Sequence, residues 1–252
     1  MKMKSIAKVS LVLGILATGV NTVTEQPVHA ENKHVQVSQN SKNLKAYYTQ
    51  PSVEYKNVTK DIFDLRDYYS RASKELKNVT GYRYSKGGKH YLIFDKNRKF
   101  TRIQIFGKDI ERIKKRKNPG LDIFVVKEAE NRNGTVYSYG GVTKKNQGAY
   151  YDYLSAPRFV IKKEVGAGVS VHVKRYYIYK EEISLKELDF KLRQYLIQDF
   201  DLYKKFPKAS KIKVTMKDGG YYTFELNKKL QTNRMSDVID GRNIEKIEAN
   251  IR

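Results

Sequence analysis

The stretch from residue 180 to residue 197, together with the segments that follow it, constrains the fold of this chain more than any other part. Ser184 stands three residues before Glu187, the spacing of a capping box, in which the hydroxyl and the carboxylate each accept a hydrogen bond from a free backbone N–H at a helix start. Apolar residues then recur at steps of three and four and define one face: Leu185, Leu188, Leu192, Tyr195 and Leu196. Polar residues are expected on the remaining surface: Lys186, Lys191, Arg193 and Gln194. The pattern predicts an amphipathic helix that buries one face.

The segments around this helix carry the pattern of β-strands. Apolar and polar residues alternate with a period of two over residues 211–216, 221–226 and 246–251. Because the apolar stripe of a helix has to be buried, the simplest architecture is a long helix packed across a small mixed sheet. Before the helix, residues 159–163 and 171–179 are predicted to form a hairpin around the turn residues 166–168.

The first half of the chain predicts a separate barrel. Apolar residues are spaced for a short helix at Ile62, Leu65, Tyr68 and Tyr69, with Thr59 or Asp61 near its start. Five short strand segments follow, divided by turn residues: 79–84, 90–94, 100–106, 121–127 and 135–139. A helix and five short strands predict a small closed barrel, of which the oligomer-binding (OB) fold is the commonest five-stranded example. A polar run at 143–147 sets the domain boundary, giving a barrel domain at 56–150 and a helix-and-sheet domain at 151–252.

The N-terminus has the pattern of a secretory signal peptide. Three lysines precede an apolar run at residues 9–20, and Val28-His-Ala30 matches a small-residue cleavage site. The apolar run is too short for a membrane-spanning helix, so we expect no membrane insertion. We predict a signal peptide at 1–30, a flexible polar tether at 31–55 and an extracellular, secreted product.

Composition narrows the function classes. The chain contains 50 Lys and Arg against 27 Asp and Glu, a formal net charge of +23 at pH 7, which favours association with polyanions and anionic surfaces without selecting one. It has no cysteine, which excludes thiol catalysis and thiolate metal sites. It also lacks the HExxH, Gly-x-Ser-x-Gly and phosphate-loop motifs. We therefore predict no enzymatic activity, no cofactor and no metal; His172 on its strand has no second His at a useful spacing.

Two stretches resemble the signatures of a known family. Tyr139-Gly-Gly-Val-Thr143 resembles the short signature near the domain junction of staphylococcal and streptococcal superantigens. The longer superantigen signature is matched in spacing by Lys180, Ile183, Leu188-Asp189, Arg193, Leu196 and Leu202-Tyr203. The run 217–241 is similar to the staphylococcal superantigen-like exoproteins in particular, and the resemblance covers nearly all of the chain from Asn57 onward. It implies an α+β, mainly β fold, with an N-terminal OB-fold barrel and a C-terminal β-grasp domain crossed by a long helix.

The strand at 221–226 leads to a candidate glycan site. Alternation places Tyr222, Phe224 and Leu226 in the core and leaves Thr223 and Glu225 as neighbours on the exposed face. We expect Asn227 to cap a helical turn, along one side of which Lys228, Gln231 and Arg234 recur at every third residue. The resemblance to the subgroup that binds sialylated lactosamine and sialyl Lewis X implies a glycan-binding role for five residues: Thr223, Glu225, Lys228, Gln231 and Arg234.

The function that this resemblance implies is immune evasion. The expected partners are sialylated glycoproteins of host leukocytes and platelets, P-selectin glycoprotein ligand among them, and binding would block adhesion or receptor signalling. A second protein target on the barrel and a homodimer stay open. The alternatives are a true superantigen that bridges class II histocompatibility molecules and T-cell receptors, and a basic binder of heparan sulfate or nucleic acid through the cluster at 108–117. Export argues against nucleic acid.

Overall fold

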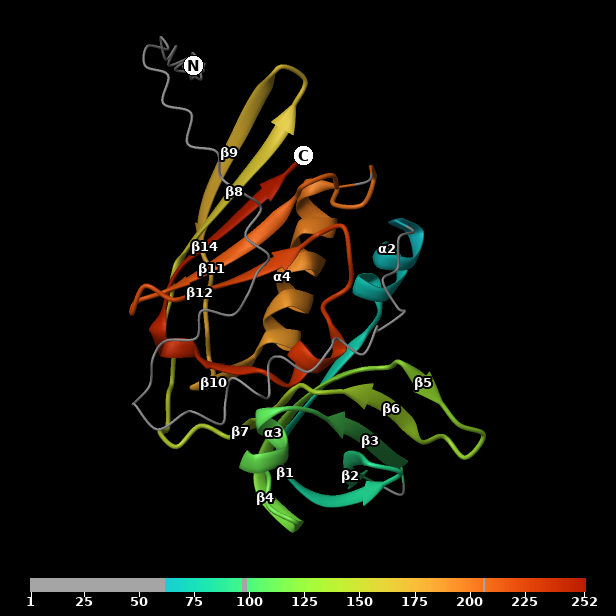
Figure 1. The fold of residues 1–252 in the computed structure, drawn as a ribbon. Helices are drawn as coiled ribbons and strands as arrows, with labels where there is room; N and C mark the ends of the chain where they lie inside the picture. The colour runs from blue at the N-terminus through green and yellow to red at the C-terminus, as the bar shows by residue number, and fades with distance from the viewer. Residues whose placement is uncertain (1–61, 97–98, 206) are drawn as a thin grey trace, which may run out of the picture. The chain divides into compact units, whose positions relative to one another are not determined.

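The computed structural model describes residues 62–96, 99–205 and 207–252, and Figure 1 shows their arrangement. The predicted signal peptide (1–30) and tether (31–55) lie outside the described residues, as do Thr59 and Asp61 at the expected helix start. None of the described helices is long and apolar enough to cross a membrane.

The barrel follows a short helix, α2 (Ile62–Ser70), whose Leu65, Tyr68 and Tyr69 are buried as the pattern predicts. Seven strands pair in the order β5-β6-β3-β2-β1-β4-β7. The elements are β1 (Ser73–Lys86), β2 (Lys89–Lys96), β3 (Lys99–Ile105), α3 (Lys108–Arg112), β4 (Arg116–Val126), β5 (Ala129–Glu130), β6 (Val136–Tyr139) and β7 (Val142–Lys144). All five predicted strands are present. The additions β5 and β7 are two and three residues long, too short to carry a readable period.

The second domain is a mixed sheet in the order β12-β11-β14-β8-β9, crossed by the helix α4 (Figure 1). The pair β14 and β8 is parallel and the other pairs are antiparallel, as a β-grasp sheet requires. The elements are β8 (Arg158–Val165), β9 (Gly168–Arg175), β10 (Glu182–Ser184), α4 (Leu185–Phe200), β11 (Lys211–Met216), β12 (Tyr221–Glu225), η1 (Thr232–Ser236), β13 (Val238–Asp240), η2 (Gly241–Asn243) and β14 (Ile244–Ile251). The predicted long helix across a small mixed sheet is confirmed.

One strand is shorter than the sequence predicts. The hairpin partner expected at 171–179 ends at Arg175, because the chain leaves the sheet edge there. Tyr176 N–H donates to Pro157 O at 3.0 Å, and Ile178 forms an isolated bridge with Ser155. The alternation of Tyr176 and Ile178 with the exposed Tyr177 and Tyr179 therefore reflects packing against residues 155–157, and the prediction of a strand at 176–179 was wrong.

The start of α4 forms half of the predicted capping box. Ser184 Oγ accepts from Glu187 N–H at 3.1 Å, as expected for an N-cap. The Glu187 carboxylate, predicted to accept from a backbone N–H, instead binds Lys180 Nζ at 2.7 Å and Lys191 Nζ at 2.6 Å. A carboxylate whose side chain is 1% exposed is better stabilised by two cations than by one neutral donor.

Helix α4 is buried on more than one face. Leu185, Leu188, Leu192 and Leu196 are buried as predicted. Lys186 and Arg193, predicted on the polar surface, are only 2% and 0% exposed, so that part of the prediction was wrong. The reason is that α4 packs against the sheet on one side, and on the other it reaches the barrel, where Lys186 Nζ donates to Ser138 Oγ at 2.6 Å.

Candidate functional site

The strand β12 presents its residues as the alternation predicts. Phe224 and Leu226 are buried at 1% and 0% exposure, and Tyr222, also predicted in the core, is half-buried against it. Glu225 is exposed and Thr223 is half-buried. Register with the neighbouring strand places Lys211 opposite Glu225 and Lys213 opposite Thr223. Facing residues on adjacent strands share one side of the sheet, so Thr223 and Glu225 lie in a polar, largely cationic surface.

The segment after β12 differs from the prediction. Leu226 and Asn227 form a turn, and the next helical element is the 3-10 helix η1, whose N-cap is Gln231. Asn227 therefore does not cap a helical turn, and that prediction was wrong. Lys228 and Gln231 lie in an irregular loop, and Arg234 lies in η1. The five predicted glycan residues still fall on one continuous segment, residues 223–234, called here the 223–234 segment.

A buried arginine on α4 holds this segment from below. The guanidinium of Arg193 donates from Nη2 to Glu225 O at 3.0 Å and from Nη1 to Lys228 O at 3.0 Å. Its Nε donates to Asp189 Oδ1 at 2.7 Å. Burial opposes the charge of Arg193, but Asp189 outweighs it and raises the pKa above its usual value, so the guanidinium stays ionised. Arg193 therefore fixes the backbone on both sides of the turn at 226–227.

Two tyrosines complete this buried support. Tyr69 on α2 donates its hydroxyl to Asp189 Oδ2 at 2.7 Å and accepts from Leu230 N–H at 3.1 Å. Tyr203 accepts from Arg193 Nη1 at 2.6 Å. The sequence pattern indicated Tyr69 only as an apolar residue of the helix. Because a buried phenol hydroxyl needs hydrogen-bond partners, Tyr69 also links Asp189 to the backbone of Leu230. We call Tyr69, Asp189, Arg193 and Tyr203 the buried support.

The short signature at 139–143 supports the far end of the segment. Gly140 and Gly141 have φ values of +49° and +76°, in the region that favours glycine. Gly141 N–H donates to Met235 O at 2.9 Å, and a Cβ on Gly140 would stand 2.2 Å from that same oxygen. The two glycines thus let the barrel approach η1 closely. Arg193 of the longer signature therefore contacts the 223–234 segment, and Gly141 of the shorter one contacts Met235, the residue that follows it.

The five side chains of the segment differ in their exposure and in the contacts that they already make. Glu225 and Lys228 form an ion pair and are about half and one third exposed, and Gln231 is exposed. Arg234 is half-buried; its Nη1 donates to Thr223 O at 3.2 Å, and its Nε has no partner among the described residues. Burial lowers the pKa of Arg234, with Asp237 opposing that shift. All five predicted residues thus lie on the 223–234 segment, and the structure gives Arg234 a supporting role that the sequence did not indicate.

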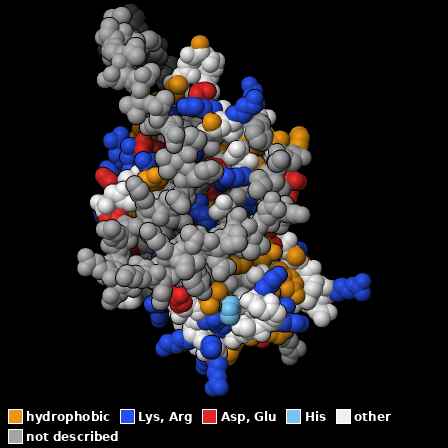
Figure 2. All heavy atoms as spheres, viewed as in Figure 1, with side chains coloured by type: hydrophobic (Ala, Val, Ile, Leu, Met, Phe, Trp, Pro, Cys, Tyr) orange, Lys and Arg blue, Asp and Glu red, His pale blue; other side chains and the backbone are white. Residues whose placement is uncertain are grey.

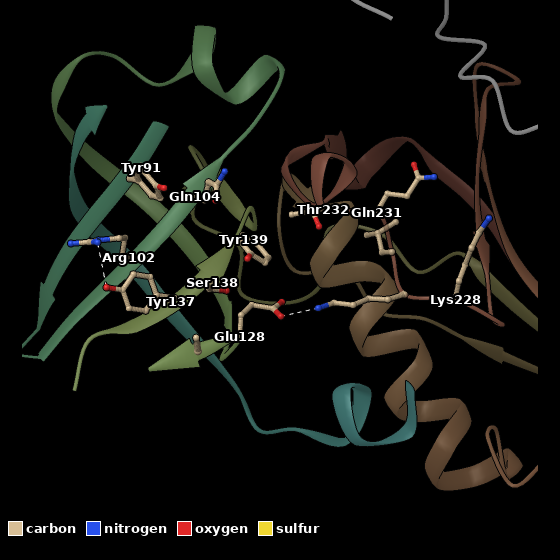
Figure 3. A pocket seen from close by; sticks show the side chains of 13 residues that line it. Tyr91, Arg102, Gln104, Glu128, Tyr137, Ser138, Tyr139, Lys228, Gln231 and Thr232 are labelled. Carbon is tan, nitrogen blue, oxygen red and sulfur yellow. Dashed lines mark hydrogen bonds and ion pairs between the residues drawn. The ribbon is translucent and has the colours of Figure 1, made fainter. Parts of the chain in front are cut away.

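A cavity adjoins the segment on the barrel side. Its volume is about 450 Å³, and it lies between strands β2, β3 and β6 and the loop 228–232 (Figure 3). Lys228 and Gln231 contribute to its wall together with residues of the barrel. In the same wall, Glu128 and Lys229 form an ion pair, with Glu128 Oε2 and Lys229 Nζ 2.7 Å apart. No sequence signal marked the barrel residues of this cavity, because cross-strand register brings them together.

The basic cluster at 108–117 is only partly available. Arg112 is bonded to Asp109 at 2.6 Å and to Glu182 at 2.9 Å, whereas Lys114, Lys115 and the two residues after them are exposed. On the face drawn in Figure 2, Lys and Arg side chains stand out from both the upper and the lower part of the described surface. The described Lys and Arg side chains that this view shows therefore lie at several separate places and not in one stripe.

The part of the chain that the structure describes contains no group of three or more His, Asp and Glu residues arranged to hold a metal ion. His172 packs its ring edge-on against Phe200 at a centroid distance of 5.0 Å. That contact gives the residue a packing role on its strand.

Comparison with known proteins identifies both domains. The family described as the staphylococcal superantigen-like OB-fold domain matches residues 63–146, and the staphylococcal and streptococcal toxin β-grasp domain matches residues 157–251. Staphylococcal superantigen-like 5 of Staphylococcus aureus strain Newman is 76% identical over 252 residues, which cover 100% of both chains. Superantigen-like protein 11 of the same strain is 47% identical, also over 100% of both chains.

Solved structures agree with this result. The crystal structure of the staphylococcal superantigen-like protein SSL5 complexed with sialyl Lewis X is 90% identical, with a TM-score of 0.75 over 76% of this chain and 100% of that one. SET3, a superantigen-like protein from Staphylococcus aureus, is 88% identical, with a TM-score of 0.74 over 79% of this chain and 100% of that one. Fold, signatures and identity over the full length lead to one conclusion: the chain belongs to the staphylococcal superantigen-like family.

Proposed function

We propose that this protein is a secreted immune-evasion protein that binds sialyl Lewis X type glycans on host leukocyte and platelet glycoproteins. Occupation of these glycans blocks adhesion or receptor signalling by steric means. The observation that carries the proposal is the 223–234 segment, which carries a hydroxyl, a carboxylate, two cations and an amide on one continuous stretch of chain. The relative whose crystal structure contains sialyl Lewis X is 90% identical to this chain, which supports the same ligand class here.

Each member of the segment suits one part of such a glycan. A sialic acid presents one carboxylate, which the Lys228 ammonium and the Arg234 guanidinium can bind as charge-assisted donors. Gln231 offers an amide that both donates and accepts, and Thr223 offers a hydroxyl. Glu225 accepts hydrogen bonds from sugar hydroxyls. The existing ion pair between Glu225 and Lys228 is solvent-exposed and weak, so a ligand can exchange with it at little cost.

Binding through one shallow site should be modest. We expect a dissociation constant on the order of micromolar for a single glycan, so tight attachment to cells depends on many glycans being engaged at once. P-selectin glycoprotein ligand, with its clustered sialylated chains, fits this requirement as a carrier.

The test measures binding to neutrophils before and after sialidase treatment, with Lys228→Ala and Gln231→Ala beside the unmodified protein. Each substitution removes a direct contact and should weaken binding about tenfold. Sialidase should abolish binding to the same cells. Lys217→Ala is the matched control, because Lys217 is exposed at the opposite end of the β11–β12 hairpin and the charge change is the same.

Two outcomes count against the proposal. Binding that survives both sialidase and the two substitutions would transfer the function to the basic cluster at 108–117 or to a protein receptor. A mitogenic response of primary T cells would favour the true superantigen.

Arg234→Lys is preferable to Arg234→Ala as a further variant, because Arg234 also supports the carbonyl of Thr223.

A further inference from the structure

The cavity beside the 223–234 segment has one wall in each domain. The β-grasp wall is the loop 228–232, and the barrel wall is the outer face of β2, β3 and β6 (Figure 3). Its volume of about 450 Å³ falls within the range of a few hundred to about 1,000 Å³ that is typical of small-ligand sites. Lys228 and Gln231 belong to both features, so the cavity adjoins the segment.

The barrel wall is a row of three side chains fixed by strand register. Tyr91 on β2 pairs with Gln104 on β3, and Gln104 pairs with Tyr139 on β6. Paired residues on adjacent strands place their side chains on the same face, about 5 Å apart. All three residues line the cavity, and Figure 3 shows them on the barrel side of it. We call them the barrel row.

The polar groups at the ends of the barrel-row side chains make no hydrogen bonds within the described residues. The hydroxyls of Tyr91 and Tyr139 and the amide of Gln104 have no hydrogen-bond partner among the described residues. None of these atoms is among the fully enclosed atoms that lack a partner, so each keeps some exposure to solvent. The row therefore offers neutral hydrogen-bonding groups, while the ring of Tyr91 is already stacked on Tyr84 at a centroid distance of 5.3 Å.

The charged groups in the same lining are partnered, except for the Nε of Arg102, which is enclosed and has no hydrogen-bond partner among the described residues. Glu128 is paired with Lys229, and the guanidinium of Arg102 lies over the rings of Tyr91 and Tyr137 at 5.9 and 5.1 Å. Such a wall suits neutral sugar units, whose hydroxyls pair with amides and phenols, better than it suits an anion. The face of strands 2 and 3 is also where OB folds in general bind oligosaccharides.

We propose that the barrel row is a second sugar subsite, which binds the neutral hexose and N-acetylhexosamine units of an extended glycan while its sialylated end occupies the 223–234 segment. The inference rests on the proposed function and deepens it, since it makes the ligand a long sialylated chain and gives the barrel a share in binding it. It also gives a reason for the close apposition of the two domains at Gly140 and Gly141.

The test compares two monovalent glycans by titration calorimetry: the sialyl Lewis X tetrasaccharide and the same structure extended at its reducing end by two neutral lactosamine units. The full chain should bind the longer glycan about three- to tenfold more tightly, as expected for one or two additional neutral hydrogen bonds. Tyr91→Phe and Gln104→Met should remove that preference and leave tetrasaccharide binding unchanged. Both variants keep the size of the side chain, so the barrel should fold normally.

Tyr82→Phe is the control, because Tyr82 is 52% exposed on strand β1 and does not line the cavity. It should leave the preference for the longer glycan intact. If the tetrasaccharide binds but the longer glycan binds no better, or if the preference survives in Tyr91→Phe and Gln104→Met, the second subsite is disproved and the proposed function stands. If the tetrasaccharide itself does not bind, the proposed function fails, and the subsite with it.

Discussion

The buried support and the exposed surface of the 223–234 segment are built from the same chemistry and serve opposite purposes. Below the segment, Arg193 and Asp189 form a salt bridge whose side chains are 1% and 2% exposed, with hydrogen bonds to carbonyls around it. On the segment, Lys228 and Glu225 form a salt bridge whose side chains are 36% and 46% exposed. A buried pair is costly to break and fixes geometry, whereas an exposed pair is easily exchanged for a ligand. Position in the fold, not residue type, separates the two roles.

The strongest test of this comparison is Arg193→Met. It leaves Asp189 buried with only the Tyr69 hydroxyl as a partner and removes the donors to Glu225 O and Lys228 O. We expect a loss of roughly 3 to 5 kcal/mol in the free energy of unfolding, measured with urea. The double variant Asp189→Leu with Arg193→Met should recover part of that loss, since no unpaired charge is then buried. A loss below about 1 kcal/mol would show that this pair does not hold the segment.

Gly140→Ala tests the support supplied from the barrel. The new Cβ would stand 2.2 Å from Met235 O, at a φ of +49°. We expect about 2 to 4 kcal/mol of destabilisation by thermal or urea unfolding, together with weaker glycan binding, because η1 has to shift. Gly87→Ala is the control; its φ is +56° but no atom lies within 4 Å of the added carbon, so only the conformational cost of about 1 kcal/mol remains. Equal losses in the two variants would mean that contact with Met235 is unimportant.

Lys186 is a further buried charge on α4, and it should make the free energy of unfolding depend on pH. Burial lowers its pKa to about 7, from 10.5 in the unfolded chain. Between these values the unfolded chain binds more protons than the folded one, so the stability contributed by this residue is lost as pH falls from about 10.5 towards 7. Relative to Lys186→Met, the unmodified protein should therefore gain stability on going from pH 7 to pH 9, by up to a few kcal/mol. A difference that stays constant with pH, as expected for the exposed control Lys114→Met, would contradict this.

The smallest effect on stability should come from the exposed surface. Gln231→Ala removes no hydrogen bond of the N-cap and uncovers no core, so the free energy of unfolding should change by less than about 0.5 kcal/mol. Its glycan binding should fall nonetheless. A loss of stability above about 1 kcal/mol would mean that the ligand-facing surface and its support are not separable.

The sequence predicted most of the local structure because local structure depends on period. Ser184 and the spacing of the leucines predicted α4, and the alternation of residues predicted which side of β12 is buried and which is exposed. The same patterns failed for Lys186 and Arg193, since a period shows which residues share a helix face but not how many faces neighbouring elements cover. They also failed at Tyr176 and Ile178, where apolar residues alternate for contacts outside any sheet.

The candidate site was also predicted only in part. The family resemblance named Thr223, Glu225, Lys228, Gln231 and Arg234, and all five lie on one segment. The resemblance could not show that Arg234 is half-buried beneath Thr223. Nor could it find the barrel row, because Tyr91, Gln104 and Tyr139 are distant in sequence and meet only through strand register.

By itself, the sequence determined the class of this protein, its two domains and the residue types available for a sialylated ligand. It did so because capping, periodicity and turn chemistry act over a few residues. The tertiary structure alone decided which charges are buried support and which face solvent, and that the barrel lines a cavity shared with the site. Burial and register depend on elements that are far apart in the chain, and those contacts exist only once the chain has folded.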